Sequence, residues 1–195
     1  MRCFLAVPLG GAALELAQQT LLQLQREFAA VRWTRPETMH ITLHFFGWIE
    51  EERARAALDI VKAVTAATAP FEVTIDRLSS FPERGPPRVL WVGSTAANPS
   101  LGALAGEVHD RLASAGFAVD ERPFRDHCTL GRARPPWPPE SRDAWRRLVT
   151  QRLGPATFTA DRVVLYESVT GPGGAVYTEW AGLPLDGGNQ PRRKP

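Results

Sequence analysis

Hydrophobic positions recur along this chain with two different spacings, and each spacing predicts a different element. In residues 12–29 the apolar side chains return every three or four positions, which predicts an amphipathic helix; they are Leu14, Ala17, Leu21, Leu24 and Phe28. Residues 40–45 instead alternate, with His40, Thr42 and His44 on one side. This alternation is typical of a strand that buries only one of its faces.

The predicted elements follow the same order in both halves of the chain. Further strands are predicted at residues 2–8, 31–33, 71–75, 88–92, about 157–168 and 175–182, and further helices at 51–67, 98–116 and around Trp145. His40 precedes Phe71 by the same number of residues as His127 precedes Phe158. Each half thus reads helix, strand, histidine strand, helix and hairpin, which is typical of a duplicated supersecondary unit.

This repeat predicts a bilobal α+β fold in which two pseudo-symmetric halves face a central cleft. Residues 1–183 are expected to form one domain, because 195 residues can bury a sizeable core. Residues 184–195 are polar and rich in Gly and Pro, and we expect them to be a disordered tail.

A short motif carries the candidate chemistry, because it occurs once in each half. His40-Ile41-Thr42-Leu43 is repeated as His127-Cys128-Thr129-Leu130. On a strand, the histidine and the threonine of each copy share a face, while the residues between them face the core. Two imidazoles with pKa values near ~6.5 supply a general base and a general acid at neutral pH. The threonine hydroxyls can donate to the non-bridging oxygens of a phosphate ester. The alternative is that both histidines serve only as hydrogen-bonding residues at strand edges, but duplication at matched positions favours a shared site.

Composition and charge narrow the function classes only a little. The formal net charge is +2, so no global field indicates nucleic acid. Lys62 and Lys194 are the only lysines among 23 basic residues, a bias that base composition explains as well as phosphate binding does. Cys3 and Cys128 fit neither a disulfide framework nor a metal motif, which favours a reducing cytoplasm. No apolar run is long enough for a membrane span, and the apolar start is too short for a signal peptide.

Metal catalysis is disfavoured by the residues around the motifs. A dinuclear phosphoesterase site needs several carboxylates beside its histidines, and only Asp126 adjoins one here, on the opposite strand face. We therefore expect no metal and no cofactor.

The two motifs and their flanks resemble a known superfamily. The stretch from Trp33 to Gly47 is similar to the first motif of the 2H phosphoesterases, and Phe124 to Arg132 to their second motif. More narrowly, residues 1–183 resemble the RNA 2′,3′-cyclic phosphodiesterases, also called 2′-5′ RNA ligases. The resemblance implies a LigT-like fold with two antiparallel sheets facing the cleft and helices outside.

The same resemblance implies a reaction and roles for residues. It implies metal-independent hydrolysis of RNA 2′,3′-cyclic phosphate ends to 2′-phosphomonoesters, with ATP-independent 2′-5′ ligation in reverse. His40 would protonate the leaving 3′ oxygen, and His127 would activate water. Arg132 matches the arginine that binds phosphate. The expected partner is RNA with such an end, for example a tRNA half or a small nucleotide, and the protein is expected to be a cytoplasmic monomer.

Several residues depart from this pattern or stay open. Asp126 replaces the usual proline and either raises the pKa of His127 or is merely solvated. His44 stands where a lysine or arginine is more common, and by alternation it shares the face of His40. Strict alternation also places Arg132 opposite His127, unless Gly131 breaks the strand, which we favour.

Phe4 and Phe46 are candidates for stacking on a base, whereas Phe45 is assigned to the core by alternation. Arg122, Arg125, Arg132 and Arg134 form either a phosphate-attracting patch or a solvated edge. His109 is read as a boundary residue of its helix.

Three other functions remain open at this stage. Within the superfamily, the substrate could be ADP-ribose 1″,2″-cyclic phosphate or a linear 2′-5′ oligoadenylate. Outside it, the chain could be a non-catalytic RNA-binding module, although binding alone does not need paired imidazoles.

Overall fold

Ten strands, four α-helices and one short 3₁₀ helix form within residues 1–134, 136–171 and 174–187, which the computed structural model describes. The helices are α1 (Gly11–Glu27), η1 (Pro36–Thr38), α2 (Glu51–Ala67), α3 (Pro99–Ser114) and α4 (Pro139–Val149). The strands are β1 (Arg2–Pro8), β2 (Val31–Trp33), β3 (His40–Trp48), β4 (Phe71–Ile75), β5 (Arg77–Phe81), β6 (Val89–Gly93), β7 (His127–Ala133), β8 (Ala156–Ala160), β9 (Arg162–Gly171) and β10 (Gly174–Pro184).

The strands form two antiparallel sheets, which confirms the predicted α+β class. The larger sheet has eight strands in the order β10-β9-β1-β3-β7-β6-β5, with β2 beside β7, and the smaller sheet pairs β4 with β8. Only one residue pair, Ile41 with Cys128, joins β3 to β7 in the larger sheet. That sheet is therefore two sets of strands that meet at the two histidine strands.

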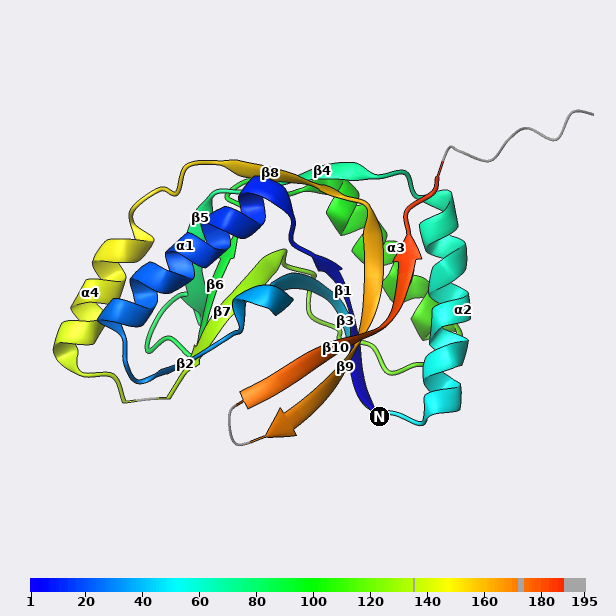
Figure 1. Cartoon of the computed structure of the whole chain (residues 1–195), viewed down its shortest axis with the longest axis horizontal. Coiled ribbons are helices and arrows are strands. Elements are labelled where there is room, and N and C mark those ends of the chain that lie inside the picture. The colour runs from blue at the N-terminus through cyan, green and yellow to red at the C-terminus, as the bar shows by residue number, and fades with distance from the viewer. Residues whose placement is uncertain (135, 172–173, 188–195) are drawn as a thin grey trace, which may run out of the picture.

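The helices lie in two pairs at opposite ends of the molecule (Figure 1). Helix α1 packs on β7 and β8 and α4 packs on β5, whereas α2 and α3 pack on each other and on β9, β10 and β3. Apolar side chains from the strands fill the interior, including Leu5, Ile41, Leu90, Leu130 and Leu165, which are all fully buried. Burial of such side chains supplies most of the free energy that holds the sheet and helices together.

The chain turns at two aspartates, and around both of them the strands differ from those predicted by alternation. The chain turns at Asp76, between β4 and β5, and again at Asp161, between β8 and β9. The predicted single strand at 157–168 is thus wrong, because its two parts belong to different sheets, and β5 was missed. Neither boundary contains Gly or Pro, and a single aspartate is a weak turn signal, so the sequence pattern did not reveal either turn.

Each histidine strand contains a bulge directly after its threonine. In β3, Thr42 pairs with Ala6 and His44 pairs with Leu5, which leaves Leu43 without a partner of its own. In β7, Thr129 pairs with Trp91 and Gly131 pairs with Leu90, which leaves Leu130 as the extra residue. An inserted residue reverses which face the following side chains occupy. The two motifs therefore have the same local geometry.

The described part of the predicted tail is held against the domain. Leu185 is buried and its amide donates to the carbonyl of Asp161, while the amides of Asp186 and Gly187 donate to Thr65 and Thr68 of the α2 end. Residues 188–195, for which disorder is predicted, lie outside the described residues. Across the described ranges, no helix is long and apolar enough to cross a membrane.

Candidate active site

The four residues of the repeated motif come together on one side of the large sheet, which we call the histidine face. Because Ile41 lies opposite Cys128, the antiparallel register sets His40 across from Thr129 and Thr42 across from His127. The two histidines are then diagonal neighbours, a position that separates backbones by about 7–8 Å. One phosphate group can contact both imidazoles at that separation. The structure thus brings together the residues that the motif singled out.

Each imidazole is oriented by a main-chain hydrogen bond of the same kind. Nδ1–H of His40 donates to the carbonyl of Thr38 at 2.6 Å, and Nδ1–H of His127 donates to the carbonyl of Arg125 at 2.8 Å. Because a carbonyl only accepts, Nδ1 must carry the hydrogen in both rings. This fixes the tautomer, and Nε2 is the nitrogen left to exchange a proton with substrate.

Aromatic rings surround His40. The ring centroid of Phe4 lies 4.7 Å from that of His40, and those of Tyr166 and Tyr177 lie at 5.6 and 5.4 Å. These are the only two tyrosines of the chain. The sequence prediction identified Phe4 but missed both tyrosines, because their place depends on how β1, β9 and β10 pair. The π faces of such rings stabilise a neighbouring cation.

His127 lies against a second aromatic group on β5 and β6. Its ring centroid is 4.9 Å from that of Phe81 and 6.1 Å from that of Trp91. Its pairing partner in β6 is Gly93, where an added Cβ would lie 2.4 Å from the carbonyl oxygen of Asp126. Glycine at this position lets the chain before His127 approach β6 closely. None of these three residues was identified from the sequence.

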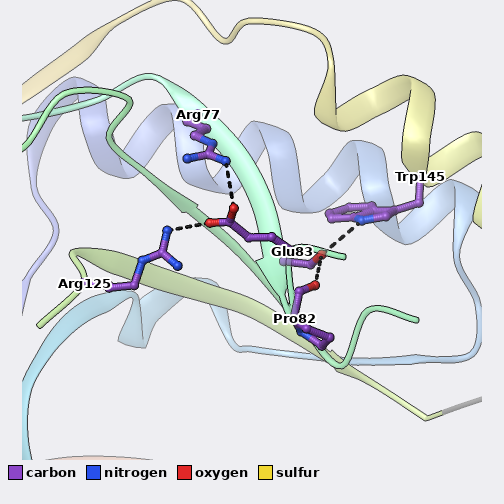
Figure 2. Close-up of polar contacts among 6 residues, drawn as sticks. Arg77, Pro82, Glu83, Arg125 and Trp145 are labelled. Atoms are coloured by element: carbon purple, nitrogen blue, oxygen red, sulfur yellow. Dashed lines mark hydrogen bonds and ion pairs between the residues drawn. The ribbon is translucent and has the colours of Figure 1, made fainter. Parts of the chain in front are cut away.

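An acidic side chain fixes the segment that precedes His127. Glu83 pairs with Arg125 at 2.5 Å and with Arg77 at 3.8 Å, and Figure 2 shows its carboxylate reaching both guanidinium groups. The hydrogen bond to Arg125 lowers the pKa of Glu83, so it stays ionised. Because the carbonyl of Arg125 also holds His127, the ion pair supports the position of that imidazole. Trp145 of α4 donates to the Ser80 hydroxyl of β5 at 3.3 Å.

Burial keeps both histidines neutral in the free protein. It lowers the pKa of His40 to about 4 despite the opposing hydrogen bond to Thr38. It also lowers the pKa of His127, and the positive charges of Arg132 and Arg125 act in the same direction. Asp126 raises the pKa of His127, but burial outweighs it. The carboxylate of Asp126 instead accepts a hydrogen bond from Asn98 at 2.6 Å.

The bulge at Leu130 brings Arg132 to the histidine face. Leu130 and Gly131 are both buried, whereas Arg132 is exposed, so Arg132 lies on the same side as Thr129. The expected break of alternation near Gly131 is confirmed in this form. A side chain at Gly131 would lie 2.7 Å from those of Val31 and Trp33, so the close packing of β2 requires glycine.

The bulge at Leu43 has the opposite consequence for His44, and the predicted face of His44 is wrong. His44 pairs with Leu5 and is buried, 4.5 Å from the ring of Phe46, rather than beside His40. Phe46 packs on Phe117 and does not reach the histidine face, so its predicted stacking role is also wrong. Phe45, assigned to the core, is 50% exposed and pairs with Phe4.

The acid stability of the protein should depend on His44. Burial lowers its pKa from 6.5 to about 4, so the unfolded chain binds the proton more tightly. The stabilisation present above pH 6.5 is lost as the pH falls toward 4, on the order of 3 kcal/mol at ~1.36 kcal/mol per unit. We expect His44→Leu to lose less stability than wild type between pH 7.5 and 5.0 in urea unfolding. An equal loss in both proteins, or a matching change in His109→Leu, would contradict this assignment.

Other residues considered from the sequence have their own local partners or face the core. Arg122 donates to the carboxylate of Asp120 at 2.9 Å, on an exposed loop. His109 contacts Asp110 at 3.1 Å on α3, as expected of a boundary residue. Cys3 and Cys128 are free and buried, and burial raises the pKa of each thiol, to about 11 and 12. Within the described ranges, no three His, Cys, Asp or Glu side chains gather as metal ligands.

Comparison with known proteins identifies relatives of this chain in sequence and in fold. A sequence model of the 2′-5′ RNA ligase superfamily matches residues 13–172. An RNA 2′,3′-cyclic phosphodiesterase of Archaeoglobus fulgidus is 31% identical over 179 residues, 92% of this chain and 97% of that protein. Another, of Geobacillus stearothermophilus, is 30% identical over 85% of this chain, which spans about half (51%) of that longer protein. A crystal structure from Thermus thermophilus is similar with a TM-score of 0.78 and 25% identity, covering 96% of this chain and 100% of that one.

Proposed function

The chain belongs to the 2′-5′ RNA ligase superfamily, one of the 2H phosphoesterases, and on this premise we propose that it hydrolyses 2′,3′-cyclic phosphate ends of RNA. The product would be a 2′-phosphomonoester, formed without a metal ion. The observation that carries the proposal is the pair of imidazoles on one face, each held by Nδ1–H on a main-chain carbonyl. This arrangement presents two Nε2 atoms to one phosphate.

In the proposed reaction one proton is removed and another is supplied. Nε2 of His127 takes a proton from water as the water oxygen attacks phosphorus. Nε2 of His40 gives its proton to the 3′ oxygen as the bond between phosphorus and that oxygen breaks. The hydroxyls of Thr42 and Thr129 donate to the non-bridging oxygens, where charge develops in the transition state. Solvent then restores the two starting protonation states.

The surroundings of the two histidines support these separate roles. Arg132 and Arg125 lower the pKa of His127, which favours the neutral form that a base requires. The pKa of His40 is lowered by burial and by His127 and not by an arginine, so a bound phosphate anion can raise it. Binding of substrate is therefore expected to protonate His40. In reverse, a 5′-hydroxyl replaces water, and a 2′-5′ linkage forms without ATP.

The proposal is tested with an oligoribonucleotide that ends in a 2′,3′-cyclic phosphate, incubated in excess EDTA. We expect full turnover in EDTA, with a 2′-phosphate as the product, since neither role of the histidines involves a metal. Chromatography against authentic 2′- and 3′-phosphates identifies the product. A 3′-phosphate, or activity that EDTA removes and Mg²⁺ or Mn²⁺ restores, would overturn the proposal.

If the RNA substrate is not hydrolysed, two other results identify the function. Turnover of ADP-ribose 1″,2″-cyclic phosphate or of a 2′-5′ oligoadenylate in its place would assign another substrate to the same chemistry. Binding of RNA without turnover of any of these substrates would favour the binding module.

A further inference from the structure

Two arginines on the histidine face lie directly opposite each other on adjacent strands. Arg32 of β2 is paired with Arg132 of β7, and both are exposed. Their neighbours Val31 and Ala133 are paired and buried on the other side, so Arg32 shares the face of Arg132 and Thr129. The pair follows Thr129 after the bulge, roughly 7 Å farther along β7 at about 3.3 Å per strand step.

Nothing in the described ranges neutralises this pair. Every ion pair of those ranges joins other residues, and no carboxylate lies within 4.0 Å of Arg32 or Arg132. In contrast, the charges of Arg77 and Arg125 are both paired with the carboxylate of Glu83. Like charges at directly opposite positions destabilise a sheet unless an anion lies between them. Two guanidinium groups at such a spacing suit the oxygens of one phosphodiester.

We infer that Arg32 and Arg132 form a subsite for a second phosphate, that of the internucleotide linkage next to the reacting end. The inference rests on the proposed function and extends it: the preferred substrate is an oligoribonucleotide chain and not a mononucleoside cyclic phosphate. Arg132 serves both the reacting phosphate and the second phosphate, because its charge also acts on His127. Arg32 is the residue that distinguishes the two substrate classes. Its contribution is to binding and specificity, and the proton transfers do not involve it.

The kinetic test compares two substrates in wild type and in Arg32→Gln. The substrates are adenosine 2′,3′-cyclic phosphate and a trinucleotide that ends in the same group. Loss of one charged contact should lower the trinucleotide-to-mononucleotide ratio of kcat/KM about tenfold. The matched control is Arg26→Gln, an exposed arginine on α1 with the same change of charge, which should keep the wild-type ratio. An equal loss on both substrates would overturn the subsite.

A binding measurement keeps this inference separate from the proposed function. The probe is a trinucleotide with a 3′-phosphate, titrated into each protein by tryptophan fluorescence at several salt concentrations. Arg32→Gln should raise Kd about tenfold and reduce the slope of log K against log salt by about 0.7, the value for one phosphate contact on a single strand. Wild-type turnover with an unchanged Kd and slope in the variant would refute the subsite alone. The expected binding change without turnover would refute the hydrolysis proposal alone.

Discussion

Replacing His127 or His40 with alanine is expected to lower kcat on an RNA 2′,3′-cyclic phosphate by about 10²–10⁴-fold. Each change removes the Nε2 atom that takes or gives a proton, while the residue beside it in the strand keeps its core packing. Because the two imidazoles act in one step, kcat of the double variant should be only slightly lower than kcat of the less active single variant. Single-turnover assays with saturating protein measure this loss apart from binding.

A control variant, unfolding midpoints and pH profiles separate a chemical role from a structural one. His109→Ala, at the boundary between the buried and exposed sides of α3, should retain activity within about twofold. His40→Ala and His127→Ala should keep the wild-type unfolding midpoint within a few degrees. The wild-type profile of kcat/KM against pH should be bell-shaped with its maximum below pH 6.5, because the pKa of both histidines is lowered in the free protein. The profile of kcat should lie at higher pH, since the bound phosphate anion raises the pKa of both rings. A monotonic profile of kcat/KM would refute the paired mechanism.

Gly93→Ala is expected to lower kcat by about 100-fold although residue 93 provides no side-chain chemistry. The added Cβ would lie 2.4 Å from the carbonyl oxygen of Asp126 and 2.9 Å from the Trp91 ring. The chain before His127 must then move away from β6, and a shift of about 1 Å at a catalytic group costs about that factor. Overpacking should also destabilise the fold by about 1–3 kcal/mol. Activity is measured well below the unfolding midpoint, and KM should change less than kcat.

A matched glycine provides the control for this prediction. Gly106 lies within α3, and an added Cβ there meets nothing within 4 Å. Gly106→Ala should leave kcat at the wild-type value and stabilise the helix by up to about 1 kcal/mol. A folded Gly93→Ala protein with wild-type kcat would show that the position of Asp126 does not control His127.

The sequence predicted the helices and the repeated motif well, because these depend on local periodicity. The spacing of Leu14, Leu21 and Leu24 predicted α1, and the matched spacing of the motifs predicted two equivalent strands. The turns at Asp76 and Asp161 were not predictable in the same way. They depend on which sheet each strand joins, and no local residue marks that choice.

The candidate site shows the same division. His40, Thr42, His127 and Thr129 share a face through simple alternation, so strand parity placed them correctly. Parity failed at His44, Phe45 and Phe46, because a bulge at Leu43 reverses the faces that follow it. The equivalent bulge at Leu130 brings Arg132 to the histidine face. In that case Gly131 had indicated from the sequence that the alternation breaks. Tyr166 and Tyr177 could not be found, since a long-range strand pairing brings them to His40.

The position of β1 in the sheet has a consequence for how the protein is made. Strand β1 lies between β3 and β9, so one of its neighbours is synthesised early and the other only after residue 162. During translation the edge of β1 that faces β9 stays without a partner until residues 162–171 have emerged from the ribosome. Neither half of the chain holds all the strands of one lobe, so two separately expressed halves should acquire structure only when mixed. The two halves of the chain therefore depend on each other for folding.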